Sequence, residues 1–135
     1  MARFNRVNLD GKSVTETRTS AAAILPGTAL KITADKFVAS ADGVGATYIA
    51  NTGHLQGLGA DDAIPAGDSI EGEYLETGRG IAVLVAASTV VTMDMPLEVG
   101  AGGVFTAVAD GVAVAYAKES YTVGEAAELV WVRGA

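Results

Sequence analysis

The sequence predicts an all-β fold: a compact β-sandwich or barrel of about ten short strands with two related halves, preceded by an extended N-terminal arm. Three observations lead to this prediction. Apolar residues fall into short runs that glycine-containing turns separate. No stretch combines apolar 3.6-residue spacing with helix-capping signals over three turns, although 21–25 and 125–129 would each allow one helical turn. Finally, one phrase of the sequence occurs twice.

The repeated phrase runs from an apolar stretch through an Asp-Gly pair. Residues 37–48 align with 105–116 without a gap, and Phe, Ala, Ala, Asp, Gly, Val and Tyr coincide. Downstream, 66–75 align with 123–132 and share a glycine, an acidic residue, a glutamate and an aromatic position. Because both motifs recur in the same order, we interpret them as one β unit used twice. The alternative is that all-β chains in general use the same few turn motifs.

The two Asp-Gly pairs, Asp42-Gly43 and Asp110-Gly111, lie between apolar runs and are predicted structural turns. Such a pair is typical of a two-residue hairpin, because glycine adopts positive φ without a Cβ clash. We therefore expect each pair to join two neighbouring antiparallel strands. Replacing Gly111 with valine should then destabilise the fold.

The expected strands follow one another from residue 29. Residues 29–32 alternate with the period of a half-buried strand. The strand at 69–75 carries Glu71 and Glu73, which are two apart and so share one face, expected to be the solvent face. The segment 51–67, which precedes this strand, has many turn residues and no hydrophobic period, which is typical of a functional or mobile loop. Other strands are expected at 37–39, 47–50, 81–86, 89–93 and 129–132, with the second unit beginning near Met95.

Size and composition restrict the classes of protein that remain possible. The chain has 135 residues, enough for one domain with a sizeable core, and no cysteine, so disulfides and thiolate chemistry are excluded. Its net charge of −7 argues against binding nucleic acid through phosphate contacts. The longest apolar run, 81–91, is too short to cross a membrane as a helix, and the N-terminus lacks the apolar segment of a signal peptide. We expect neither a nucleic acid nor a membrane as partner.

The first twenty residues differ from the rest, so we divide the chain into an extended arm, 1–20, and a single β domain with an internal pseudo-repeat, 21–135. Much of the scarce positive charge lies in this arm, among spaced apolar residues. Such a segment can order on a partner by strand addition, whereas the simpler alternative is a frayed terminus. The candidate contact residues are Arg3, Phe4, Arg6, Val7, Leu9 and Val14.

No catalytic constellation is recognisable. His54 is the single histidine and has no neighbouring serine or cysteine, so a turn residue is the better interpretation. Asp61-Asp62 lacks the spacing of an EF-hand. Glu71, Glu73 and Glu76 resemble a glycosidase pair only in the trivial sense that acids along one strand lie close together. We predict that the protein is not an enzyme and uses no metal or cofactor.

A family resemblance rests on the second unit. Pro-Leu-x-Val beginning at Pro96, then Gly-x-Phe-Thr-Ala, Ala-Asp-Gly-x-Ala-Val-Ala and Gly-Glu-x-x-x-x-Val-Trp-Val, resembles the head decoration, or capsid cement, proteins of tailed bacteriophages. The phrase that begins at Pro26, the small-residue composition and the lack of cysteine extend the resemblance over most of 21–135.

The resemblance implies a structural virion protein, made in the cytoplasm of the bacterial host and bound to the outer capsid surface. There it would bridge subunits of the major capsid protein, stabilise the expanded shell, associate as a homotrimer and use its N-terminal segment as a contact arm. The alternative is a non-catalytic β-sandwich recognition module that binds glycans or a host surface. Exposed aromatic residues around Tyr121 or in 51–67 would favour that alternative.

Overall fold

The computed structural model describes residues 3–11 and 14–135; residues 1, 2, 12 and 13 of the predicted arm lie outside this description. The described chain forms twelve strands and two short 3-10 helices, which confirms the all-β prediction. None of its helices is long and apolar enough to cross a membrane. The first half contains β1 (Thr15–Thr19), β2 (Ala29–Thr33), β3 (Lys36–Ala39), β4 (Tyr48–Ala50), η1 (His54–Gln56) and β5 (Ser69–Tyr74). The second contains β6 (Gly80–Val85), β7 (Val90–Val91), β8 (Pro96–Val99), η2 (Ala101–Gly103), β9 (Phe105–Ala107), β10 (Ala115–Ala117), β11 (Tyr121–Thr122) and β12 (Glu128–Gly134).

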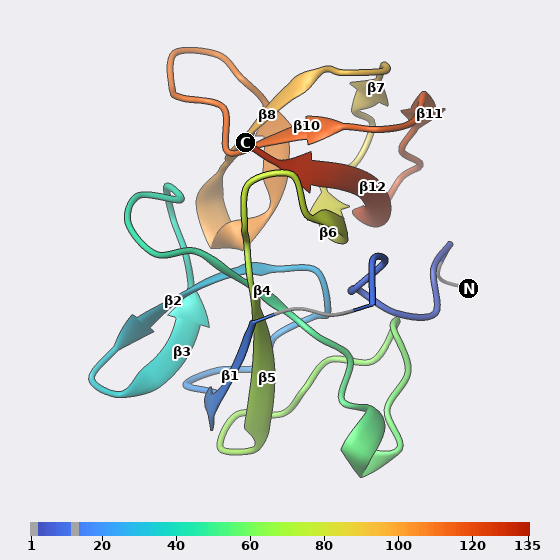
Figure 1. Ribbon diagram of the computed structural model, residues 1–135. Coiled ribbons are helices and arrows are strands. Elements are labelled where there is room, and N and C mark those ends of the chain that lie inside the picture. Colours follow the sequence, from blue (N-terminus) through green and yellow to red (C-terminus); the bar gives the residue numbers. More distant parts are fainter. Residues whose placement is uncertain (1–2, 12–13) are drawn as a thin grey trace.

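Ten of the strands form two sheets that occupy separate lobes (Figure 1). The first half is a five-stranded sheet of order β1-β5-β4-β2-β3, and the second is a closed barrel of order β10-β12-β6-β9-β8. A small ribbon of β7 and β11 lies beside the barrel. The barrel component of the predicted fold is therefore present.

Both halves have the same strand order. Read from β6, the barrel runs β6-β12-β10-β8-β9, which matches β1-β5-β4-β2-β3 strand for strand. The barrel closes by a parallel contact of Val85 with Phe105, and a parallel bridge between Ser20 and Phe37 occupies the corresponding place in the first half. Phe37 and Phe105, which coincide in the repeated phrase, thus have equivalent positions and are both fully buried.

The last strand of each unit departs from the sequence alignment. Tyr48 pairs with Tyr74, whereas its counterpart Tyr116 pairs with Arg133, two residues beyond the Trp131 that aligns with Tyr74 in the sequence. The Gly-acid motif lies before the strand and does not determine the register in which that strand pairs with its neighbour. The sequence alignment and the strand pairing can therefore differ by two residues.

Apolar side chains form one main cluster, which fills the barrel and reaches Ala29 and Ile49 of the first lobe, and two smaller clusters. The barrel is filled by small and branched side chains around Phe105, including Val83, Val85, Leu97 and Val130. Phe37 belongs to one of the smaller clusters, which lies in the first lobe. Each side chain of this kind contributes about 1.5–3 kcal/mol when fully buried, and the main cluster joins the two lobes.

The predicted hairpins at the Asp-Gly pairs are wrong. The chain bends at both pairs, but β3 and β4 each pair with β2, while β9 and β10 each pair with β8. Each loop therefore crosses over an intervening strand instead of joining neighbours. Gly43 has a φ of 67°, but Gly111 is not among the glycines with positive φ, so the reason given for destabilisation by valine at Gly111 does not hold.

Two further expectations concern segments that lie closer to the core than their sequence indicates. Glu73 is only 2% exposed, so the face that it shares with the half-buried Glu71 is not open to solvent. The amide of Asn51 donates to both carboxylates, at 2.9 Å to Glu71 and 3.1 Å to Glu73, and such hydrogen bonds lower the cost of burying the carboxylate. Within 1–20, residues 15–19 form β1 and pair with β5 in the first sheet.

Candidate binding groove between the two lobes

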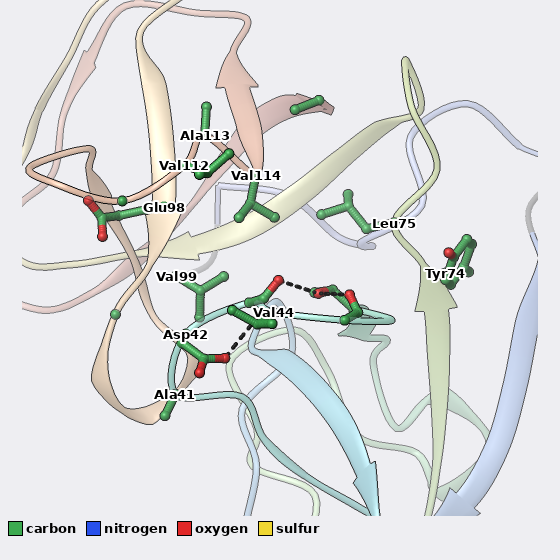
Figure 2. A pocket seen from close by; sticks show the side chains of 16 residues that line it. Ala41, Asp42, Val44, Tyr74, Leu75, Glu98, Val99, Val112, Ala113 and Val114 are labelled. Carbon is green, nitrogen blue, oxygen red and sulfur yellow. Dashed lines mark hydrogen bonds between the residues drawn. The ribbon is translucent and has the colours of Figure 1, made fainter.

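An open groove of about 780 Å³ lies between the lobes, where the loop 41–45 of the first half meets the loop 111–114 of the second (Figure 2). These are the two Asp-Gly loops that the repeated phrase predicts as structural turns. Because the sequence aligns them without a gap, the groove is lined by equivalent parts of both units. The structure thus brings Gly43 and Gly111 to one site.

The first loop is held in place by short polar contacts. The Asp42 carboxylate accepts a hydrogen bond from the Val44 N–H at 3.0 Å, and the Ser40 hydroxyl accepts one from the Gly43 N–H at 2.9 Å. The Thr47 hydroxyl donates to the carbonyl oxygens of Gly43 and Gly45. These bonds satisfy backbone groups locally, as Asx and Ser/Thr turns do, and give the loop a defined shape.

The second loop is organised by one carboxylate from the neighbouring strand. Glu98 accepts a hydrogen bond from the Ala109 N–H at 2.5 Å, and the same side chain lies beside Gly111. Val114, at the end of the loop, donates its N–H to Leu97 at 2.8 Å and accepts from Ala135 at 3.0 Å. Both ends of the loop are therefore hydrogen-bonded to residues of β8.

Exposed valines stand at equivalent positions of the two loops. Val44 is 75% exposed and Val112 is 83% exposed. The half-buried Leu75 and Val114 and the buried Val99 also line the groove (Figure 2). Large apolar side chains held on shaped loops around a hollow are typical of a surface that contacts another molecule.

The charge of the groove has one sign. The charged side chains among its lining residues are the carboxylates of Asp42 and Glu98, and no lysine, arginine or histidine is among them. Asp110 adds a third carboxylate on the loop that carries Gly111. A complementary ligand would be apolar and cationic.

The predicted arm residues do not lie at this groove. Val7 is fully buried in the barrel cluster, and its carbonyl oxygen accepts the Ala82 N–H at 2.8 Å. Phe4 and Leu9 pack against the cluster of Ala82, Leu84 and Leu129 on the outer face of the barrel. Arg6 and Val14 are exposed.

Arg3 connects the N-terminal segment to the second lobe. Its guanidinium donates to both carboxylate oxygens of Glu119, at 2.8 and 2.6 Å, and stacks 3.6 Å from the ring centre of Tyr121. This hydrogen bond is the main cause that raises the pKa of Arg3. Burial by itself raises the pKa of Glu119. The hydrogen bonds from Arg3 and from the Trp131 N–H lower it by more, so the pKa of Glu119 lies below its ordinary 4.5. The contact is a bidentate ion pair within one molecule.

The residues considered for catalysis have structural partners. The His54 ring lies 3.3 Å from the Thr52 hydroxyl, in a 3-10 turn. Asp62 accepts the Gly59 N–H at 2.8 Å, and Glu76 pairs with Arg79 at 2.6 Å. Among the described residues, no group of three or more His, Cys, Asp or Glu side chains is placed to hold a metal ion.

No aromatic surface is formed where the recognition-module alternative would need one. Tyr121 lies under Arg3, and its hydroxyl donates to Glu128 at 2.9 Å. The loop 51–67 has no phenylalanine, tyrosine or tryptophan. Tyr74 and Tyr116 are 37% and 40% exposed.

Comparison with known proteins finds a similar fold among solved structures. No protein-family model matches the sequence, and no curated protein does. Among solved structures, the chain is similar to the head fiber gp8.5 N base of bacteriophage phi29, with a TM-score of 0.61 and 15% sequence identity. The match covers 92% of this chain and 95% of that one. At this identity the likeness concerns the fold, and it extends over both lobes.

The groove valines, Val44 and Val112, were not identified from the sequence as functional residues. The available signal was the valine that follows both Asp-Gly pairs, at a position where a solvent-facing turn would carry a polar residue. Sequence reasoning singled out the turns for their backbone geometry and not for the side chains that they display.

Proposed function

We propose that the protein is a structural component of a phage head that binds the outer surface of the capsid and bridges subunits of the major capsid protein. The single observation that carries this proposal is the fold shared with a phage head fiber base over nearly the whole of both chains. The sequence motifs that resemble head decoration proteins support it independently. They lie in the strands and turns of the second lobe.

The physical basis is linkage between binding and assembly. A protein that binds only the closed, expanded shell stabilises that state by mass action. If it associates as a homotrimer, several weak contacts act together and release becomes slow. The acidic surface, with a net charge of −7, favours basic patches on the partner and keeps the free protein soluble.

The N-terminal segment contributes to this function in a restricted way. Arg3, Phe4, Val7 and Leu9 make contacts within the molecule. The exposed side chains of the segment, Arg6 and Val14 among them, are the ones available to a capsid. We therefore assign the segment two tasks: it covers the outer face of the barrel and presents a few exposed residues.

Co-sedimentation tests the proposal. Purified protein is mixed with expanded phage heads that lack a decoration layer and, separately, with unexpanded heads. We expect saturable binding to expanded heads alone. Equal binding to both forms would contradict selective recognition of the expanded shell, and absence of binding to heads from several phages would overturn the proposal.

A further inference from the structure

Resting on the proposed function, we propose that the groove between the lobes receives an extended segment of the major capsid protein in which an apolar side chain neighbours a lysine or arginine. The groove, and not the N-terminal segment, then makes the principal attachment. Its shape, its backbone and its charge each restrict the ligand.

The shape of the groove suits a chain segment. Its volume of about 780 Å³ extends between two loops that each present an exposed apolar side chain, Val44 and Val112. Burying the two valines against an apolar side chain removes hydrocarbon surface from water, at about 25 cal/mol for each Å². Because Asp42 and Glu98 brace the loops, little conformational entropy is lost on binding.

The backbone of the second loop favours an extended ligand. Within residues 3–11 and 14–135, the N–H groups of Val112 and Ala113 donate to no acceptor, and both residues lie just before β10. An extended segment alongside them gains main-chain hydrogen bonds, as in strand addition. This requirement disfavours a compact sugar or a helix.

Charge determines which extended segment fits. The lining contributes Asp42 and Glu98 and no cation, and Asp110 lies on the same loop as Val112. An acidic segment would be repelled, and a neutral one would bring no positive charge to these carboxylates. A lysine or arginine beside the apolar residue pairs with them and fixes the register of the segment.

The experiment uses three synthetic peptides of equal length on the whole, isotope-labelled protein, observed by NMR. One alternates valine with lysine, one serine with lysine, and one valine with glutamate. We expect the valine–lysine peptide alone to shift the amide signals of 41–45 and 111–114. Equal shifts from the serine–lysine peptide would mean that charge alone causes the binding, and would overturn the inference. A response elsewhere on the surface would also overturn it.

Substitutions connect the groove to the capsid. Val112→Asp places a carboxylate in the groove, and Val90→Asp, at a 63% exposed position on β7, is the matched control. We expect Val112→Asp to weaken binding to expanded heads by more than about tenfold and Val90→Asp to leave it unchanged, because the apolar side chain of the segment packs against Val112 and a carboxylate buried against it is costly. Both variants should melt at the temperature of the parent protein, since both positions are exposed.

The outcomes separate this inference from the function on which it rests. Heads that bind the parent and Val112→Asp equally leave the capsid role standing and overturn the groove. If the heads bind neither the parent nor Val112→Asp, the capsid role is wrong, and so is the capsid segment proposed to occupy the groove. Self-association that disappears in Val112→Asp would identify a second copy as the occupant and overturn the inference.

Discussion

Val7 tests whether the N-terminal segment is part of the folded domain. Its side chain is fully buried with Ile81 and Val83 in the barrel cluster. Val7→Ala removes two methyl groups, worth about 1.6 kcal/mol in transfer free energy at about 0.8 kcal/mol each. The residual cavity adds to this, so we expect a loss of about 2–3 kcal/mol in the free energy of unfolding.

Val14 provides the control, because it comes from the same segment and is 56% exposed. Val14→Ala should change the free energy of unfolding by less than about 0.5 kcal/mol. Urea denaturation of both variants gives the two values, with equal slopes expected for both transitions. If Val7→Ala is no more destabilising than Val14→Ala, the segment does not pack as described, and the interpretation as a detached arm regains support.

Other predictions concern the turns and the ion pair. Gly43→Ala should destabilise the fold by about 1–3 kcal/mol, because alanine is strained at a φ of 67° and its Cβ would lie 2.9 Å from the Val99 side chain. Gly111→Ala meets only the flexible end of the Glu98 side chain and should cost less than half as much. Thermal unfolding of the two variants compares these losses. The lowered pKa of Glu119 predicts stability that is present above about pH 4.5 and is lost as pH falls through the lower folded value. Glu119→Gln should therefore flatten the loss of stability as the pH falls below about 4.5; denaturation curves at a series of pH values measure this, and an unchanged pH profile would contradict the assignment. Arg3→Ala should make the N-terminal segment more accessible to proteolysis with little change in overall melting, because the pair lies near the surface.

Much of the fold was predictable because the signals are local. Short apolar runs between glycine turns indicate strands, and the repeated phrase aligned Phe37 with Phe105, which the structure places at equivalent positions. Turn residues report where the chain bends. They do not report which strand lies on the other side, and so the Asp-Gly pairs suggested hairpins where the chain crosses over β2 and β8.

The groove and the position of the N-terminal segment depend on tertiary structure. Phe4 and Leu9 look like isolated apolar residues in a polar background, yet they cover an apolar strip that β6 and β12 leave on the outside of the barrel. The groove exists only because the two lobes place the loops 41–45 and 111–114 opposite each other. Neither arrangement has a signature within one segment of sequence.

A cryo-electron microscopy reconstruction of expanded heads saturated with the protein tests the central claim most directly. The account predicts density for the two-lobed domain on the outer surface, over the joints between major capsid protein subunits, with the groove facing the shell. Density confined to the inside of the shell or to the tail, or an outer surface identical to that of untreated heads, would contradict it.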